Sequence, residues 1–391
     1  MHIVYVCADP GVPVFGTKGA SLHVREVVRV MARGHDVSLI CARSGGEPPH
    51  DLGDVSVYTL PPVTGLDAAE REHAARRSAA AVTDCIAAAE AAHGPADLVY
   101  ERYSLWSTGG MRAAAARAIP GVLEVNAPLI EEQARHRTLH DRRGAERVAR
   151  TVLGDAAVVV AVSEPVAQWA RRRSPSPARV HVVPNGVDPD RFAPPPTRTS
   201  DIFTVGFVGS LKAWHGTDLL VAAVRRLRHP PRLVIVGDGP ERDRLEHLAR
   251  PLGDRAVFTG ALPPEQVPAA LAQMDVTVAP YPRDATYFSP LKVFEYMAAG
   301  TAVVATAVGQ IPSIIEHGRT GLLVRHGDPA ALAGAIRRLQ QEDLLRRSLG
   351  ARARTVVRHL HSWTGIVEKI LALARVVPAT VIDLPDPLEI R

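Results

Sequence analysis

Residues 287–300, YFSPLKVFEYMAAG, have the composition of a loop that leads into a ligand-binding helix. Ser289 is a favourable N-cap, and Pro290 suits the first helical position because its missing N–H would have no partner there. The following N–H groups and the positive end of the helix dipole attract an anion, to which Lys292 adds a full charge. Glu295 lies about one turn into the helix and can accept from hydroxyls beside that anion. The pattern indicates a sugar-nucleotide site, or else an amphipathic core helix with an ordinary cap.

Two glycine-rich loops also follow apolar runs that are typical of strands. They are FGTKGAS at 15–21 and GSLKAWHG at 209–216. Glycine lets backbone N–H groups approach an anion closely, so the first of these loops is a candidate phosphate site, with a plain surface turn as the alternative. Only four of the 46 basic residues are lysines, and three of them lie in these loops or in 287–300: Lys18, Lys212 and Lys292.

Short apolar runs alternate with longer helical patterns along most of the chain, which predicts parallel sheets covered by helices on both faces. The expected strands are 3–7, 36–41, 98–100, 122–125, 157–162, 180–183, 204–208, 232–236, 256–258, 276–279, 302–305 and 321–324. The expected helices are 19–33, 68–93, 105–118, 130–153, 218–228, 241–252, 265–274, 290–299 and 329–341.

A proline-rich stretch interrupts this alternation near the middle of the chain. Residues 184–200 include Pro184, Pro189 and a run of three prolines at 194–196, which favours a stiff extended connector. We therefore expect two doubly wound α/β domains. Their predicted limits are 1–184 and 201–375, with a linker at 185–200 and a flexible tail at 376–391.

Several of these stretches resemble the motifs of the family 4 retaining glycosyltransferases of the GT-B fold. Residues 287–300 resemble the family's donor-binding signature, where two glutamates usually stand eight positions apart. Glu295 matches the second glutamate, and Tyr287 occupies the place of the first. Residues 182–188 are similar to the inter-domain motif, and 235–241 to a landmark of the C-terminal domain. The resemblance covers nearly the whole chain.

The resemblance implies that a nucleoside-diphosphate sugar, which we expect to be UDP-linked, binds the second domain. Transfer of a hexose or amino-hexose would run by front-face attack, with the leaving diphosphate taking the acceptor's proton, so the protein works by positioning and charge stabilisation. A double displacement through a carboxylate has no candidate nucleophile. The implied donor-binding residues are Gly16, Ser210, His215, Gly237, Asp238, Gly239, Tyr287, Ser289, Leu291 and Glu295, and those at the reacting centre are Gly19, Asn126, Lys212 and Lys292.

The chain departs from the family pattern at three places. Ser210 and His215 stand where members usually carry an arginine and a lysine, so we expect Lys212 to supply the charge and His215 to donate a hydrogen bond. Asn126 stands where a histidine is common, and an asparagine cannot act as a general base. The missing first glutamate leaves Tyr287, or Asp284 three residues earlier, to hold the transferred sugar.

The acceptor is expected in the first domain, where carboxylates follow predicted strands. In a protein of net charge +5, such a cluster would suit a cationic acceptor such as an amino sugar or aminocyclitol, and solvated loop acids are the alternative. The basic stretch 135–150 offers a less favoured contact with an anionic membrane and a lipid or cell-envelope acceptor. The candidate acceptor residues are Asp9, Glu101, Glu124 and Glu131.

Composition and cysteine usage limit the remaining possibilities. Only 5% of residues are aromatic and no basic run is interleaved with them, which argues against a nucleic-acid partner. Asp188 and Asp190 could hold a metal but are more typical of a turn, and the three cysteines lack metal-site spacing. We expect no cofactor and no metal, and a cytoplasmic location because the first residues lack a signal peptide's pattern. A non-catalytic sugar-nucleotide binder and a GT-B epimerase remain alternatives.

Overall fold

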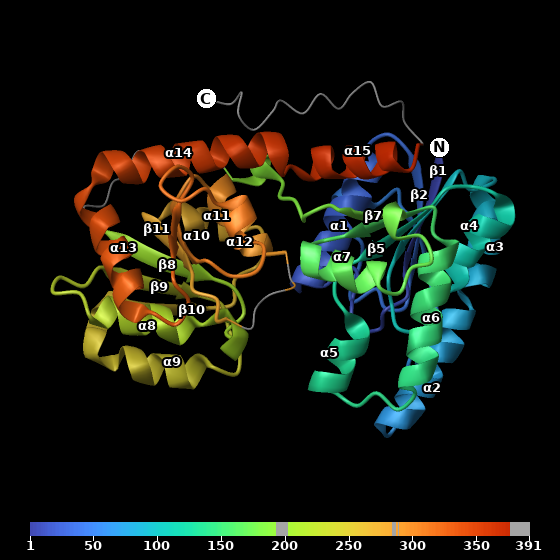
Figure 1. The fold of residues 1–391 in the computed structure, drawn as a ribbon, viewed down its shortest axis with the longest axis horizontal. Coiled ribbons are helices and arrows are strands. Elements are labelled where there is room, and N and C mark those ends of the chain that lie inside the picture. The colour runs from blue at the N-terminus through green and yellow to red at the C-terminus, as the bar shows by residue number, and fades with distance from the viewer. Residues whose placement is uncertain (193–201, 284–286, 288, 376–391) are drawn as a thin grey trace. The chain divides into compact units, whose positions relative to one another are not determined.

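The computed structural model describes residues 1–192, 202–283, 287 and 289–375 (Figure 1). The chain divides into two compact units. The first contains Met1–Asn185 and the chain from Trp363 onward, and the second contains Gly186–Ser362. Each unit is built on a parallel sheet with helices on both faces, which confirms the predicted doubly wound α/β fold.

The sheet of the first unit has seven strands in the order β3-β2-β1-β4-β5-β6-β7, and every neighbouring pair is parallel. The winding direction reverses between β1 and β4. In sheets of this kind, a ligand crevice opens at the carboxyl ends of the strands that flank such a reversal. The strands are β1 His2–Cys7, β2 Asp36–Cys41, β3 Ser56–Thr59, β4 Leu98–Arg102, β5 Gly121–Val125, β6 Val158–Ala161 and β7 Val180–Val182.

The helices of the first unit cover a sheet whose central strands are buried along their whole length. All six residues of β1 are buried, as expected for a parallel strand covered on both faces. α1 packs against α15, and α3 packs against α4. The helices are α1 Gly19–Ala32, α2 Ala68–Ala80, α3 Val82–His93, α4 Gly109–Arg117, α5 Leu129–His136, α6 Arg142–Asp155, α7 Glu164–Arg171 and α15 Trp363–Leu373.

The sheet of the second unit has six parallel strands in the order β10-β9-β8-β11-β12-β13. Its winding direction reverses between β8 and β11, so the loops after these two strands border the expected crevice. The strands are β8 Thr204–Val208, β9 Arg232–Val236, β10 Ala256–Gly260, β11 Val276–Ala279, β12 Ala302–Thr306 and β13 Leu322–Val324.

Two apolar clusters make up the core of the second unit, one on each side of its sheet. Because side chains alternate along a strand, Phe207 belongs to one cluster and its neighbour Val208 to the other. α8, α9 and α13 contribute to the first cluster and α11 to the second. The helices are α8 Thr217–Arg225, α9 Arg242–Ala249, α10 Val267–Ala272, α11 Leu291–Ala298, α12 Ile311–Ile314, α13 Pro329–Gln341 and α14 Asp343–Leu360.

The expected end of the second domain at residue 375 is wrong. The last helix, α15, belongs to the first unit, where its buried Trp363 lies edge-on to the imidazole of His23 in α1, with ring centroids 4.9 Å apart. Phe192, from the expected linker, lies in the core of the second unit. Residues 193–200 of the expected linker and the whole expected tail, 376–391, lie outside the described residues.

Several predicted helices have different limits in the structure. The helix expected over 68–93 is two helices, α2 and α3, that meet at Ala81. The helix expected over 130–153 is also two, and the second begins where Asp141 accepts a capping hydrogen bond from the Gly144 N–H. The sequence patterns did not predict β3, α7, α14 or α15.

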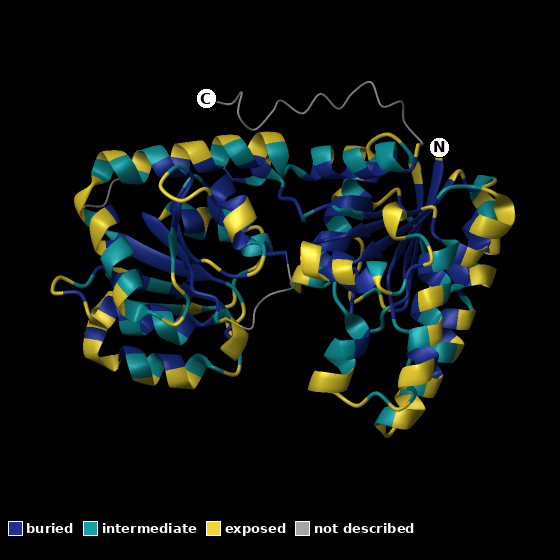
Figure 2. Ribbon diagram, viewed as in Figure 1, coloured by how far each residue is buried: buried dark blue, intermediate teal, exposed yellow. Residues whose placement is uncertain are grey.

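Burial follows the layered arrangement (Figure 2). The strands of both sheets are mostly buried, and exposed residues lie on the outer surfaces of the helices. Cys7 and Cys41 are buried free thiols, as predicted, and Cys85 is half-buried. In the part of the chain that the structure describes, no helix combines the length and hydrophobicity needed to span a membrane.

Candidate functional site

Two glycine turns lie against one another where β8 and β9 end. The Gly209 N–H donates to the Val236 carbonyl at 2.9 Å, and the Leu211 N–H donates to the Asp238 carbonyl at 2.8 Å. A Cβ on Gly237 would lie 1.9 Å from the Gly209 carbonyl oxygen, so no side chain fits at this contact. Gly237 also has a φ of 137°, which favours glycine. The predicted donor loops therefore form one tightly packed surface.

Lys292 brings α11 onto this surface. A Cβ placed on Gly209 would lie 2.9 Å from the Lys292 Nζ and 2.8 Å from its Cε, so the absence of a side chain at Gly209 makes room for the lysine. The ammonium faces the rings of Phe207 and Tyr281, with its Nζ 5.1 and 5.4 Å from their centroids. Among the described residues, Lys292 has no ion-pair partner.

Burial also changes the charge state of Lys292. It lowers the pKa of the ammonium to about 7, and the nearby Glu295 carboxylate opposes the shift. A cation held against aromatic rings and backbone, without a carboxylate partner, is poised to receive an anion. Phe207 and Tyr281 were not among the predicted site residues, because aromatic residues beside a strand are usually core residues.

The start of α11 differs from the prediction. The helix begins at Leu291 and its N-cap is Pro290, so Ser289 is not the N-cap residue. The Leu291 N–H donates to the Ser289 carbonyl at 3.0 Å, so the expectation that it is free for an anion is wrong. Of the two N–H groups predicted to be free at the helix start, only that of Lys292 has no partner among the described residues.

His215 is oriented differently from the predicted donor. Its Nδ1 lies 2.5 Å from the Ser210 carbonyl oxygen, which can only accept. Burial and the neighbouring Lys292 lower the pKa of His215 to about 3, so the imidazole is neutral. The single ring proton therefore sits on Nδ1, and Nε2 is an acceptor. The expectation that His215 donates to a phosphate is wrong, because its proton is already engaged.

The other predicted donor residues have mixed surroundings. Asp238 accepts from the Gly239 N–H at 2.7 Å and pairs with Arg242 at 3.3 Å, so it stabilises its own loop. Lys212 lies with its Nζ 5.7 Å from the Trp214 ring centroid. Tyr287 is half-buried, and Asp284, its alternative, lies outside the described residues.

The glycine loop of the first unit precedes α1 but offers fewer free donors than expected. The Gly16 N–H donates to the Pro13 carbonyl at 2.9 Å, so it closes a turn and is not available to an anion. Gly19 is the first residue of α1, and no acidic residue lies in the first turn of that helix. Ser21 is fully buried, and its hydroxyl has no hydrogen-bond partner among the described residues.

Glu101 and Glu124 do not share a pocket. β4 and β5 are paired so that Arg102 lies beside Glu124, which places Glu101 and Glu124 on opposite faces of the sheet. Glu101 is fully buried and accepts from the Met111 N–H at 2.9 Å and from the Ser107 hydroxyl. Burial raises the pKa of Glu101, and these hydrogen bonds oppose the shift.

Glu124 belongs to a buried network on the other face. One of its oxygens lies 2.7 Å from the His23 Nε2 and accepts from the Tyr100 hydroxyl at 2.8 Å. The other lies 3.5 Å from the Arg102 guanidinium. Burial alone would raise the pKa of Glu124, but His23 and Arg102 hold it below its ordinary value. The predicted acidic acceptor pocket is wrong for Glu101 and Glu124, because protein groups occupy both carboxylates.

The remaining predicted acceptor residues lie apart from this network. Glu131 accepts from the Trp169 Nε1 at 2.6 Å and from Arg173 at 2.8 Å. Asp9 accepts from the Gly11 N–H at 2.8 Å and is half-exposed. His23 and Arg102 were missed by the sequence analysis. A charged residue at the last position of a buried strand, as at Arg102, is the signal that could have identified one of them.

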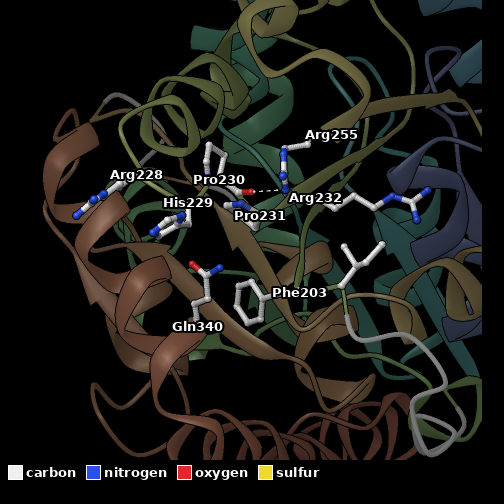
Figure 3. Close-up of a pocket in the computed structure, with 9 residues that line it drawn as sticks. Phe203, Arg228, His229, Pro230, Pro231, Arg232, Arg255 and Gln340 are labelled. Atoms are coloured by element: carbon white, nitrogen blue, oxygen red, sulfur yellow. Dashed lines mark hydrogen bonds between the residues drawn. The ribbon is translucent and has the colours of Figure 1, made fainter.

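A cavity of about 380 Å³ opens at the opposite, amino-terminal edge of the second sheet (Figure 3). It is lined by basic and apolar residues, but the side chains of Arg228 and Arg232 point away from one another. None of the predicted site residues lines it. Within the described residues, no group of three or more His, Cys, Asp or Glu side chains could hold a metal ion. Asp188 instead caps the turn at Pro189–Arg191, with the Asp190 N–H at 3.0 Å.

Comparison with known proteins identifies the family. The model described as Glycosyltransferase Family 4 matches residues 17–191, and the model described as Glycosyl transferases group 1 matches residues 202–342. The two models together match most of the chain, which belongs to the family 4 glycosyltransferases. This confirms the resemblance of its motifs, and its two sheets are those of the GT-B fold.

Individual relatives match parts of the chain at moderate identity. A D-inositol 3-phosphate glycosyltransferase of Acidothermus cellulolyticus is 34% identical over 58% of this chain and 56% of its own length. A 2-deoxystreptamine glucosyltransferase of Streptomyces kanamyceticus is 32% identical over 41% of this chain and 45% of its own length. The chain thus matches about half the length of these relatives. The Anabaena protein HepE, solved with UDP, has a TM-score of 0.71 at 19% identity and covers 96% of this chain and 100% of its own.

Proposed function

We propose that the protein transfers a sugar from a nucleoside diphosphate, UDP in the first instance, to a small hydroxylated acceptor. The observation that carries this proposal is the unpaired Lys292 ammonium above the side-chain-free surface of Gly209. A diphosphate placed there would meet a cation and the Lys292 N–H at the start of a helix. The same groups would stabilise the charge that develops on the leaving diphosphate.

The donor and acceptor are inferred in part from the relatives. HepE has been solved with UDP and with UDP-glucose, which favours a UDP-sugar. The two curated relatives are named for inositol phosphate and 2-deoxystreptamine, both of which have a hydroxylated six-membered carbon ring. We therefore propose a cyclitol or a similar small glycoside as the acceptor. With Glu101 and Glu124 engaged by the protein, recognition of ammonium groups no longer supports this choice.

We further propose that transfer retains the anomeric configuration and needs no metal ion. Among the described residues, Lys292 and Lys212 are cations of the donor loops without a carboxylate partner, and they can balance a diphosphate. Asn126 stands where members of the family often carry a histidine, and its amide cannot take a proton, so the leaving diphosphate is the proposed base. Activity in excess EDTA and the anomeric coupling of the product by NMR test these two points.

The deciding experiment has a binding step and a turnover step. Thermal shift with UDP, GDP and dTDP, and with UDP-glucose, UDP-galactose and UDP-N-acetylglucosamine, identifies the donor. The chosen donor is then incubated with 2-deoxystreptamine, D-inositol 3-phosphate or no acceptor, and products are followed by mass spectrometry. UDP binding with a new glycoside supports the proposal. UDP binding without transfer or donor hydrolysis would favour a sugar-nucleotide binder, and interconversion of the free donor would favour an epimerase.

A further inference from the structure

Trp214 is a large aromatic side chain that the second unit leaves in solvent. Its indole is 57% exposed, whereas Trp169 and Trp363 are 3% and 4% exposed. It lies in the turn Ala213–His215, within the donor loop that follows β8. The indole N–H has no hydrogen-bond acceptor among the described residues. A single exposed apolar residue is ordinary on a protein surface, so the case for a ligand contact depends on where Trp214 lies and how it is held.

A row of aromatic rings connects Trp214 to the cation of the donor site. The centroid of the Trp214 ring lies 6.1 Å from that of His215. The His215 centroid in turn lies 6.0 Å from that of Phe207 and 5.9 Å from that of Tyr281. The Lys292 ammonium faces these last two rings. The exposed indole therefore lies beside the surface on which a diphosphate is proposed to bind.

The backbone of the donor loop holds Trp214 in place. The His215 N–H donates to the Lys212 carbonyl at 2.9 Å, which closes the turn around Trp214. The turn ends at Gly216, where a Cβ would lie 2.0 Å from the Pro280 carbonyl oxygen, so the loop is packed directly against the segment that follows β11. Because the backbone that carries the indole is already ordered, less conformational entropy is lost when a ligand binds to it.

The indole suits a ring that has an apolar face and a hydroxylated rim, such as a pyranose or a cyclitol. The C–H groups of such a ring pack on the indole face, and the indole N–H can donate to a hydroxyl oxygen. A nucleobase also stacks on aromatic rings. Because α11 supplies Glu295, the proposed contact of the ribose, we assign the nucleobase to α11 and the loop after β8 to the other side of the diphosphate. The transferred sugar and the acceptor meet on that side.

We propose that Trp214 is a stacking platform for a sugar or cyclitol ring, with the indole N–H donating to one of its hydroxyl oxygens. The ring is that of the transferred sugar or of the acceptor. Lys212, whose Nζ lies 5.7 Å from the centroid of the same indole, remains available to the diphosphate. The inference rests on the proposed function, because it assumes that such rings bind the protein.

Fluorine NMR tests the contact. The chain contains four tryptophans, so protein labelled with 5-fluorotryptophan gives four ¹⁹F signals, and Trp214→Phe identifies the signal of Trp214. We expect this signal to move further with UDP-glucose than with UDP if the ring is the transferred sugar. It should move when 2-deoxystreptamine or D-inositol 3-phosphate is added to the UDP-bound protein if the ring is the acceptor.

Two results of the NMR experiment would overturn the proposal. In the first, UDP alone moves the Trp214 signal as far as UDP-glucose does and neither cyclitol moves it further, which would assign the indole to the nucleotide. In the second, the signal responds to no substrate of a transfer reaction that the same protein catalyses.

Matched substitutions separate stacking from apolar bulk. Trp214→Phe keeps an aromatic face and should retain kcat/KM within about threefold, whereas Trp214→Leu lacks that face and should lose about tenfold. The loss should appear in the KM of the substrate that carries the stacked ring, and UDP affinity should stay unchanged in both variants. Leu344→Ala is the control, because Leu344 is an exposed apolar residue of α14, and it should leave both quantities unchanged.

The outcomes separate the two proposals. Wild-type kcat/KM in Trp214→Leu would refute the platform while leaving the transferase activity in place. A loss of UDP affinity in Trp214→Leu that equals its loss of kcat/KM would likewise overturn the platform, because the indole would then bind the nucleotide. If the unmodified protein neither binds UDP nor turns over a sugar nucleotide, the proposed function fails and this inference fails with it.

Discussion

The carboxyl edges of the two sheets use their charged residues in opposite ways. At the edge of the first unit, Glu124 is buried and contacts two buried residues, Arg102 and His23. At the edge of the second unit, Lys292 faces aromatic rings and the backbone of Gly209, and no described carboxylate pairs with it. At the first edge the charged side chains are paired with one another, and of the buried groups that the structure describes there, only neutral polar groups lack partners. At the second edge a cation, Lys292, has no anionic partner among the described residues.

The difference shows what each edge is suited to bind. A buried ion pair is stabilising only while both partners are present, so the network of the first unit is part of the folded structure itself. A desolvated lysine without a partner costs stability in the free protein, and an anionic ligand can offset that cost. Removing the charge of Glu124 should therefore destabilise the fold of the first unit. Removing the charge of Lys292 should instead weaken ligand binding by the second unit.

The largest expected effect comes from Glu124. Glu124→Ala leaves Arg102 buried without its carboxylate and should cost about 3–5 kcal/mol of unfolding free energy, measured by urea denaturation. Because the pKa of Glu124 is held below its ordinary value, its contribution is present above about pH 4.3 and is lost as the pH falls through the folded-state pKa. Glu124→Gln should flatten this acid loss.

Glu101→Gln is the matched control. Burial raises the pKa of Glu101, whereas the pKa of Glu124 is lowered, so the two carboxylates should change stability with pH in opposite directions. Relative to this variant, the wild type should lose stability as the pH rises from the unfolded-state pKa to the folded-state pKa.

One outcome would contradict the role given to Glu124. If Glu124→Ala folds as stably as the wild type and instead weakens the binding of a cationic acceptor, then Glu124 binds the acceptor and is not occupied by protein groups alone.

The next effect is on UDP affinity. Lys292→Met removes the cation of the second edge and should weaken UDP binding about ten- to hundredfold, as expected for the loss of a charge-assisted hydrogen bond. Its melting temperature should equal or exceed that of the wild type, since a desolvated charge is removed. Isothermal titration and thermal denaturation measure both. Lys369→Ala, on α15 of the first unit, is the control and should leave UDP affinity unchanged.

A smaller effect is expected at Glu295. If this carboxylate accepts from the ribose hydroxyls, Glu295→Ala should weaken UDP binding about tenfold and leave the affinity for inorganic pyrophosphate unchanged. Competition binding with the two ligands makes the distinction. Equal losses of affinity for both ligands would show that Glu295 acts through the charge of Lys292, whose pKa it influences, and does not bind the ribose.

The smallest effect is a dependence on pH. The pKa of Lys292 is about 7 in the free protein. A bound diphosphate raises this pKa, so above pH 7 the Lys292 amine takes up a proton when the ligand binds. UDP affinity should fall about fivefold between pH 7 and pH 8, where the phosphate is fully ionised. His215 stays neutral throughout, because its pKa is about 3. Lys292→Arg should bind with little change over this range, and a pH-dependent arginine variant would contradict the assignment.

The sequence by itself determined the strands and the loops of the second unit. β8, β9 and β11 have the predicted limits, because runs such as Arg232–Val236 are rich in β-branched residues and end in glycine turns. The need for glycine at Gly209 and Gly237 is likewise local, since it follows from backbone conformation and close approach. The helix α11 was predicted for the same reason, although its first residue and its free N–H groups were misplaced.

Only the tertiary structure decided how the charged residues are used. Arg102 and Glu124 are 22 residues apart in the sequence, and their pairing depends on the register of β4 and β5. The same register places Glu101 on the opposite face of the sheet. His23 comes from a helix 101 residues away from Glu124 in the sequence, and Trp363 joins it from the far end of the chain. Alternation along a strand is local, but the residues that meet each face are set by packing between distant segments, which no short pattern encodes.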